Sequence, residues 1–327
     1  MTTKFDLFTP CCADWFSEAY HFLEVGDDPW NGTQAQELRR RILQGDYRLC
    51  NRQTCNVPLA TLEELKASPA YIAEAVLSRE VLAAMEAGQV ELPGGPSVIS
   101  VTADPRCNLK CPSCRADHIH TVTPDEEKGL EKTEAFLRNH RESVRLLKFG
   151  NGEVFFSPWL RRMLKGLSSE VYPHLEAVSI LSNGLLADEH NFKLLEPGSK
   201  YIKRVNISVD AGNAPTYRKT RGGDWERLLK NLGWLAQQRR AGRFEWLALY
   251  FVTRKDNFES IPEFIELGRE LGVDMAYFSA FFDRGSMSDG EYREQTVHLP
   301  LHPLHGRLAE ICGPYRTDQK LLFRFPL

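Results

Sequence analysis

The feature that most constrains the fold is a regular alternation of two kinds of segment from residue 97 onward. Short apolar runs rich in β-branched residues lie at residues 97–102, 144–149, 177–182, 204–209, 246–252 and 275–280. Between them are longer amphipathic stretches such as residues 225–240 and 261–272, which have the apolar period of helices. Strands that alternate with helices pair in parallel through right-handed crossovers. The pattern predicts an α/β fold, a partial (β/α)6 TIM-like barrel, with an open doubly wound sheet as the alternative.

Composition narrows the classes of function. The chain has 327 residues, 42% of them hydrophobic and 26% charged, with a formal net charge of −3. A chain without a basic excess has no electrostatic field to attract nucleic acid or an anionic membrane surface, so we expect neither as a partner. No apolar run approaches the 18 or so residues that span a bilayer, and the N-terminus does not resemble a signal peptide. We therefore expect a cytoplasmic protein.

The eight cysteines form two groups and one isolated residue. In a reducing compartment they are more often metal ligands or catalytic groups than disulfides. The early group is Cys11, Cys12, Cys50 and Cys55, the central group is Cys107, Cys111 and Cys114, and Cys312 stands alone.

The central group directly follows the first predicted strand. Its C-x3-C-x2-C spacing gives three thiolates, which can hold three irons of a [4Fe–4S] cubane and leave the fourth iron open to a non-protein ligand. The alternative is a zinc site completed by His118 or His120.

Polar and small residues follow the later strands at the same edge of the predicted sheet, where functional groups of such folds gather. Each short motif alone is more often a turn or a helix cap. Together they indicate a binding site, because all of them lie on one predicted face. Small residues let the backbone approach a ligand, a carboxylate accepts hydrogen bonds from an ammonium group, and Ser and Asp suit sugar hydroxyls. The candidate ligand-binding residues are Gly150, Asn151, Gly152, Glu153, Ser182, Asn183, Ser208, Asp210 and Arg254.

Together these motifs resemble the radical SAM superfamily over roughly residues 95–285. "CNLKCPSC" matches the cluster motif, "GNGE" is similar to the motif that binds the methionine amino group, and "ISVDA" is similar to the ribose-binding strand. The segments "APTYRKTRGGDWERLLKNL" and "VTRKDNFESIPEFIELGRELGVD" are also similar to the family. Two departures are Ser113, where the family usually has an aromatic residue, and the lack of a clear "GxIxGxxE" pattern.

The resemblance implies a cofactor and a reaction. S-adenosylmethionine would chelate the open iron, with Glu153 and its loop holding the amino group. Arg254 and Lys255, just past the fifth predicted strand, either meet the carboxylate or are simply solvated. The reduced [4Fe–4S] cluster would cleave S-adenosylmethionine to a 5′-deoxyadenosyl radical, which abstracts a substrate hydrogen. A one-electron donor such as flavodoxin or ferredoxin is the implied protein partner.

The early cysteines lie in a segment that resembles the SPASM module or its shorter twitch form, including the Trp30-Asn31 and Leu38-Arg39 positions. The resemblance implies a second, auxiliary [4Fe–4S] cluster, although this module follows the barrel in better-known relatives and precedes it here. Whether Cys12 or Cys312 is a ligand stays open; a zinc knuckle is the alternative. The expected domains are residues 1–57 (auxiliary module), 58–94 (helical linker), 95–285 (barrel) and 286–327 (C-terminal extension).

Three hypotheses of function follow. The first is modification of a peptide or protein by crosslinking, epimerisation or oxidation. The second is radical oxidation or rearrangement of a small molecule such as a sugar or aminocyclitol, and the third is a non-catalytic metal-binding module. No catalytic acid or base is evident. We interpret His298, His302 and His305 as loop and helix-start residues, Tyr217 as a packing residue, and the isolated Cys312 as a small buried one.

Overall fold

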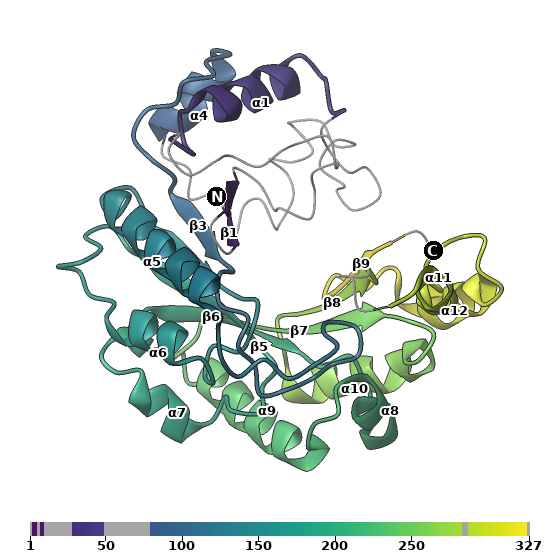
Figure 1. Ribbon diagram of the computed structural model, residues 1–327. Coiled ribbons are helices and arrows are strands. Elements are labelled where there is room, and N and C mark those ends of the chain that lie inside the picture. Colours follow the sequence, from purple (N-terminus) through teal and green to yellow (C-terminus); the bar gives the residue numbers. More distant parts are fainter. Residues whose placement is uncertain (1, 5–6, 10–27, 49–78, 283–286, 326–327) are drawn as a thin grey trace. The chain divides into compact units, whose positions relative to one another are not determined.

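The computed structural model describes residues 2–4, 7–9, 28–48, 79–282 and 287–325 (Figure 1). The early cysteines at positions 11, 12, 50 and 55 lie outside these ranges. The chain divides into two units, each described by itself below. Unit 1 comprises Met1–Asp104, Val122–Asn151 and Ser168–Val178, and unit 2 comprises Pro105–Thr121, Gly152–Leu167 and Ser179–Leu327.

The described strands form a sheet with the order β2-β1-β3-β4-β5-β6-β7-β8-β9. Their bounds are β1 Thr2–Lys4, β2 Leu7–Thr9, β3 Val98–Val101, β4 Leu146–Phe149, β5 Ala177–Ser182, β6 Ile202–Ser208, β7 Trp246–Thr253, β8 Met275–Ala280 and β9 Leu321–Arg324. β3 pairs with β4 in parallel, as do β6 with β7, β7 with β8 and β8 with β9. A doubly wound sheet would reverse its strand order at a switch point. The order instead follows the chain from β3 onward, so the predicted partial (β/α)6 arrangement of an α/β fold is confirmed.

Three described strands were not predicted from the sequence. β1 pairs in parallel with β3 and antiparallel with β2. β9 extends the sheet beyond β8, where Phe323 stacks on Phe278 with ring centroids 4.5 Å apart.

The described helices alternate with the strands. They are α1 Thr33–Leu43, α4 Arg79–Glu86, α5 Pro124–Asn139, α6 Pro158–Lys165, α7 Glu189–Leu194, α8 Ala214–Thr220, α9 Trp225–Arg240, α10 Ile261–Leu271, α11 Asp289–Gln295 and α12 His305–Cys312, with 3-10 turns at Gly198–Tyr201, Phe258–Ser260 and Gly313–Tyr315.

Local sequence explains where the helices begin and end. Thr123 caps α5 in a reciprocal capping box with Glu126, and the Asp224 side chain caps α9 by accepting the Arg227 N–H. α10 ends at Gly272, whose φ of 68° lies in the left-handed region that glycine adopts without a Cβ penalty.

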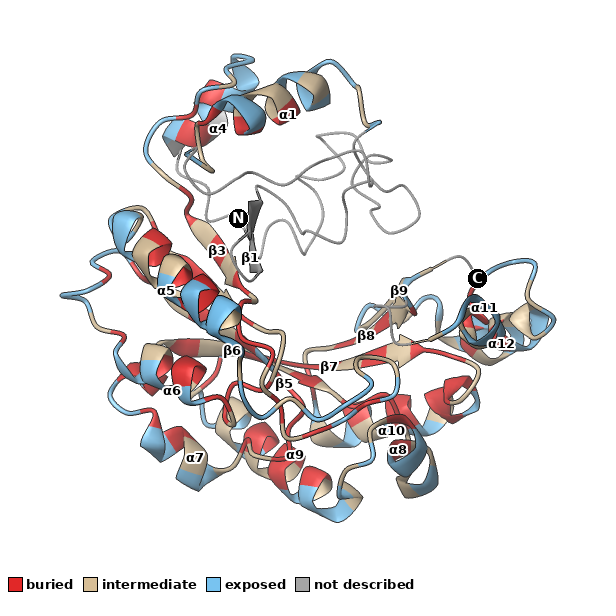
Figure 2. Ribbon diagram, viewed as in Figure 1, coloured by how far each residue is buried: buried red, intermediate tan, exposed pale blue. Residues whose placement is uncertain are grey.

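The core of unit 2 lies between its strands and helices. α9 packs against β7, and α10 packs against β8 (Figure 1). Figure 2 shows buried residues concentrated on the strands and on one face of α9 and α10. Phe251, Phe264 and Phe278 are fully buried and pack edge to face or tilted, with centroids 5.0 to 5.7 Å apart. This packing joins β7 and β8 to α10.

In unit 1, α1 is joined to the segment that follows α4. The Asn31 side chain donates to the Leu92 carbonyl at 2.8 Å and accepts the Leu92 N–H at 3.0 Å. The guanidinium of Arg39 lies 4.7 Å from the centre of the Trp30 ring, which packs on a small cluster of Val81, Ala84 and Leu92. The Trp30-Asn31 pair and Arg39 thus hold α1 in place.

None of the described helices combines the length and the apolar composition that crossing a bilayer requires.

Candidate functional site

The three central cysteines lie in the loop that opens unit 2. Cys107 and Cys111 are buried, Cys114 is half-buried, and all three are free thiols. The Cys107 N–H donates to the Ile119 carbonyl at 2.9 Å, and the Cys114 N–H donates to the Cys111 carbonyl at 2.9 Å. These bonds close the loop on itself, so three sulfurs are presented by one ordered segment.

Each of the three sulfurs has a nitrogen donor. The Leu109 N–H lies 3.4 Å from the Cys107 Sγ. Arg221 Nη1 lies 3.7 Å from the Cys111 Sγ, and Arg115 Nη2 lies 3.5 Å from the Cys114 Sγ. Burial raises the pKa of the Cys107 thiol, and the Leu109 N–H opposes that shift. Donors aimed at sulfur suit thiolate ligands of a metal cluster, whose negative charge they offset.

Glu153 connects the loop after β4 to the end of β5. It is fully buried, and its carboxylate accepts hydrogen bonds from the Ser182 hydroxyl at 2.8 Å and from the Asn183 N–H at 2.7 Å. Its own N–H donates to the Arg106 carbonyl at 2.8 Å, next to the first cysteine. Burial raises the pKa of Glu153, and the bonds from Asn183 and Ser182 oppose that shift. The structure therefore brings three predicted site residues together beside the cysteine loop.

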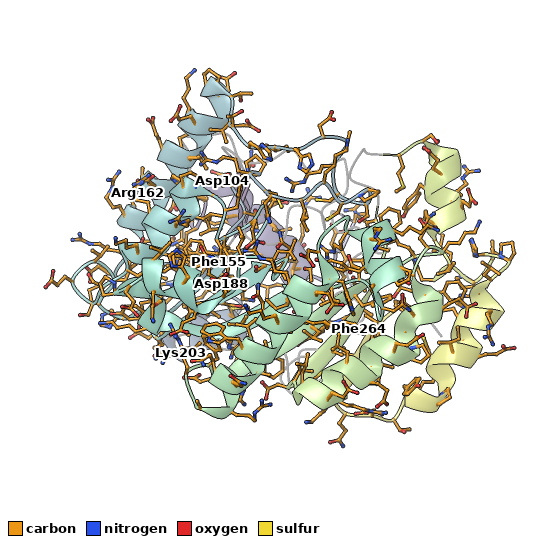
Figure 3. All side chains as sticks on the ribbon, turned by 90° about the horizontal axis from the view of Figure 1, so that it is seen from below. Asp104, Phe155, Arg162, Asp188, Lys203 and Phe264 are labelled. Carbon is orange, nitrogen blue, oxygen red and sulfur yellow. The ribbon has the colours of Figure 1, made fainter. Side chains whose placement is uncertain are left out.

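Two further contacts tie this group to its surroundings. The Asn183 amide lies 3.7 Å from the Cys107 Sγ and donates to the Asn108 side chain at 2.8 Å. Phe155, labelled in Figure 3, packs on Phe192 of α7 with ring centroids 4.9 Å apart and so anchors the segment that follows Glu153.

Asp210, the predicted sugar ligand after β6, is held by protein groups. It is 1% exposed, and its φ of 58° lies in the left-handed region, which Asp tolerates better than most side chains. Its carboxylate accepts the Val252 N–H at 2.7 Å and forms a 2.7 Å ion pair with Arg221. Burial acts to lower the pKa of Arg221, but the charges of Asp210, Cys111 and Tyr217 together outweigh burial and the pKa is raised.

Arg254 and Asn257 lie at the end of β7. The Asn257 side chain donates to the Asp210 carbonyl at 3.1 Å and to the Val252 carbonyl at 2.9 Å, and it accepts the Arg254 N–H at 2.8 Å. Arg254 is 1% exposed, and burial lowers its pKa while Asp210 opposes that shift. The neighbouring Lys255 instead forms an ion pair with Glu294. Of the two cations that follow β7, Arg254 is therefore the buried one, beside Asn257 and Asp210.

Several buried donors here have no hydrogen-bond partner within the part of the chain that the structure describes. They are Arg254 Nε and Nη2, Arg221 Nε, the Tyr217 hydroxyl and the Thr253 hydroxyl. A buried unpaired guanidinium is costly and calls for an anionic or polar ligand. The donor set therefore fits a ligand with a carboxylate, as the aminocarboxylate of S-adenosylmethionine would be.

The remaining predicted site residues are placed as follows. In unit 1, the Gly150 N–H donates to the Val101 carbonyl at 3.1 Å, and the Asn151 amide donates to the Thr102 carbonyl at 2.9 Å. Gly152 has a φ of 85°, where a larger residue would be strained. Ser208 ends β6, in register with Tyr250 of β7. Cys312, Tyr217 and His298 are buried, and His305 begins α12.

Within the described ranges, no three His, Cys, Asp or Glu side chains gather to hold a single metal ion. A cubane cluster presents a separate iron to each thiolate, so its cysteines need not converge on one point. A zinc ion requires all its ligands at about 2.0–2.3 Å from one centre. The zinc alternative is not assembled here, and the rings of His118 and His120 lie against each other at 5.3 Å.

Sequence reasoning missed Arg221. It lies between α8 and α9 in a polar stretch, where no periodicity separates it from the neighbouring Arg218 and Lys219. The one available signal was the similarity of the whole segment to the family, which does not single out a residue.

The fold and the site define a class: an α/β protein whose parallel strands end in a three-cysteine loop and buried polar groups. Comparison with known proteins identifies the family to which this fold and site belong. The family model described as "Radical SAM superfamily" matches residues 103–275, which is more than half of the chain. The chain belongs to the radical SAM superfamily.

Individual relatives are more distant. The chain is 26% identical over 231 residues to GTP 3',8-cyclase of Brucella abortus (strain S19) and to that of Brucella canis. The match covers 67% of this chain and 62% of each relative, so the chain spans less than two thirds of the length of these relatives. Among solved structures, Streptococcus suis SuiB bound to S-adenosylmethionine has 17% identity and a TM-score of 0.49, covering 89% of this chain and 61% of SuiB.

Proposed function

We propose that the protein is a radical SAM enzyme whose open-iron [4Fe–4S] cluster is held by Cys107, Cys111 and Cys114. The observation that carries the proposal is three free thiols on one ordered loop, each with a nitrogen donor at its sulfur and bordered by unpaired buried donors. When bound, the cluster and S-adenosylmethionine together supply reductive cleavage of a C–S bond and abstraction of a hydrogen atom from the substrate.

The chain's own residues bind and orient the cofactor. Glu153 accepts a hydrogen bond from the amino group at Oε2, which keeps a lone pair beyond the one used by the Asn183 N–H, while Oε1 accepts from the Ser182 hydroxyl and the Phe155 N–H. Arg254 donates its unpaired Nε and Nη2 to the carboxylate. Ser208 and Asp210 lie at the end of the strand expected to hold the ribose, and Asp210 also keeps Arg221 in place. Burial of Glu153, Asp210 and Arg254 excludes water from the reacting centre.

For the substrate, we propose a peptide or protein that is crosslinked, epimerised or oxidised. The support is the sequence of the early module, whose four cysteines at positions 11, 12, 50 and 55 resemble a SPASM or twitch site for a second [4Fe–4S] cluster. Such a cluster would take up an electron from the substrate radical or bind the substrate. A one-electron donor of the flavodoxin or ferredoxin type would reduce the first cluster. The four free cysteines of the described chain suit a reducing, cytoplasmic compartment.

A second candidate substrate is a small molecule. The relatives that support it are the GTP 3',8-cyclases, whose name specifies a nucleotide rather than a peptide. A gene for a short precursor peptide beside this one would favour the peptide, and a biosynthetic cluster for a small molecule would favour the alternative.

Anaerobic reconstitution tests the metal assignment. Iron and sulfide are counted per chain in the wild type, in Cys107→Ala and in Cys312→Ala, a control cysteine that is buried in α12. About four irons per chain support one cubane and about eight support two. Cys107→Ala should lower the count while Cys312→Ala should not. A Cys107→Ala variant with the iron content of the wild type would contradict the assignment of Cys107 as a cluster ligand.

The auxiliary cluster has its own variant. Cys50→Ala should lower an eight-iron count toward four and should leave cleavage of S-adenosylmethionine intact, because the first cluster is untouched. An unchanged iron count and normal substrate turnover in Cys50→Ala would remove the auxiliary cluster from the proposal.

A further inference from the structure

One guanidinium in the site contacts both a carboxylate and a cysteine sulfur. Arg221 follows α8 directly, and its side chain is 13% exposed. Its Nη2 forms the 2.7 Å ion pair with the Asp210 carboxylate, and its Nη1 lies 3.7 Å from the Cys111 Sγ. Its backbone carbonyl lies 3.9 Å from the same sulfur. Arg221 thus approaches Cys111 from its side chain and from its main chain.

The ion pair fixes the direction in which the cation points. The Asp210 carboxylate is itself held by the Val252 N–H at 2.7 Å, and its carbonyl is held by the Asn257 amide at 3.1 Å. A planar guanidinium can bind a carboxylate with one nitrogen and a second acceptor with another, which the ammonium of lysine cannot do in the same geometry. Because one nitrogen of Arg221 is committed to Asp210, the other is directed at the sulfur.

A permanent cation at a cluster ligand has a predictable effect on the cluster. Reduction adds one negative charge, so a nearby positive charge and an N–H donor to sulfur stabilise the reduced form more than the oxidised form. Arg remains charged at any working pH, so the effect does not depend on its titration. The ion pair with Asp210 offsets part of the cost of burying the cation.

We infer that Arg221 is a positioning residue that raises the reduction potential of the cluster at Cys107, Cys111 and Cys114, and that Asp210 aims it. The inference rests on the proposed function, since it requires the cluster to be bound. It goes beyond that proposal because it attributes part of the cluster's reduction potential to the Arg221 guanidinium. If Arg221 serves only to pair with Asp210, its removal will alter stability but leave the potential unchanged.

The test is a redox titration of the reconstituted protein, followed by electron paramagnetic resonance of the reduced cluster, without substrate. The variants are Arg221→Met, which removes the charge and the donors, and Arg221→Lys, which keeps the charge. The control is Arg239→Met, which breaks an Arg–Asp pair of similar length, 2.8 Å to Asp274, with no cysteine sulfur among its contacts.

We expect Arg221→Met to lower the ratio of reduced to oxidised cluster at least tenfold at the potential where the wild type is half reduced, a shift of about 59 mV for one electron. Arg221→Lys should lower the ratio by a smaller factor, and Arg239→Met should leave it unchanged.

Each other outcome has a defined meaning. An unchanged ratio in Arg221→Met with full iron content overturns the inference and leaves the proposed function standing. If Arg221→Met does not fold, an unchanged ratio in Arg221→Lys overturns it. A wild type that binds no cluster overturns the proposed function and the inference with it.

Discussion

The Glu153 carboxylate accepts a 2.7 Å hydrogen bond from the backbone N–H of Asn183, whose side chain in turn lies 3.7 Å from the Cys107 Sγ. A buried acid on the loop after β4 is thus connected to Cys107 through one residue at the end of β5. A substitution at Glu153 should therefore also affect the surroundings of the Cys107 sulfur, and a substitution at Cys107 should affect those of the Glu153 carboxylate.

Glu153→Gln should weaken the binding of S-adenosylmethionine. A hydrogen bond to a charged group contributes about 1.5–3 kcal/mol, so the Kd should rise roughly tenfold to a hundredfold. The measurement is equilibrium binding to the anaerobically reconstituted protein. Glu170→Gln, at an exposed position, should bind like the wild type. Equal Kd values for Glu153→Gln and the wild type would exclude Glu153 as a ligand of the amino group.

Asn257→Ala should destabilise the protein. The side chain makes three hydrogen bonds at a position 2% exposed, and each contributes about 1 kcal/mol, so the free energy of unfolding should fall by about 3 kcal/mol. Denaturant unfolding measures this loss. Asn139→Ala, at the exposed end of α5, should cost less than about 0.5 kcal/mol. Equal losses in the two variants would contradict the assigned role.

Two Gly→Ala changes should have opposite signs. At Gly212 an added Cβ would lie 2.4 Å from the Ser260 carbonyl oxygen and 2.6 Å from the Phe264 nitrogen, both backbone atoms that cannot turn aside. We expect a loss of about 1–3 kcal/mol in stability. At Gly233, inside α9, nothing lies within 4 Å, so alanine should add about 1 kcal/mol through helix propensity. The melting temperatures of the two variants are compared with that of the wild type. A Gly212→Ala variant that is more stable than the wild type would show that the close approach of Gly212 to the backbone of Ser260 and Phe264 does not require glycine.

Stability should fall as the pH is lowered below about 6.5, because of His298. Burial, with the charges of His305 and His302, lowers the pKa of His298 from 6.5 to about 4. The unfolded chain therefore binds a proton at a higher pH than the folded protein does. The contribution of neutral His298 is complete above pH 6.5 and is lost as the pH falls toward 4, by up to about 3 kcal/mol.

The check compares unfolding at pH 7.5 and pH 4.5. His298→Phe keeps a ring between Phe282 and Phe325 and should lose much of the pH dependence. His190→Phe, at an exposed position, should retain it. A wild-type protein equally stable at both values would contradict the assignment.

The sequence predicted those parts of the fold that carry a local signal. Residues 225–240 and 275–280 are the helix α9 and the strand β8, because apolar period and caps are local properties. β9 was missed, since "LLFR" is short and gains its stability from pairing with β8, about forty residues earlier. The pairing of β9 with β8 could not be predicted from the apolar pattern of residues 321–324 alone.

The site divides in the same way. The cysteine spacing identifies its residues by type and distance along the chain. The role of Asp210 differs from the expectation for a simple ligand, because its two oxygens are bound by Arg221 and by the Val252 N–H. Contacts between segments that are far apart in the chain cannot be predicted from the local sequence of either segment.

The most direct test of the central claim is the formation of 5′-deoxyadenosine from S-adenosylmethionine by the reduced, iron-reconstituted protein. The wild type and Cys312→Ala should form it, and Cys107→Ala, Cys111→Ala and Cys114→Ala should each fall to the background of free iron and sulfide. A wild type that carries iron yet forms no 5′-deoxyadenosine, or a Cys107→Ala variant that forms it at the wild-type rate, would contradict the account.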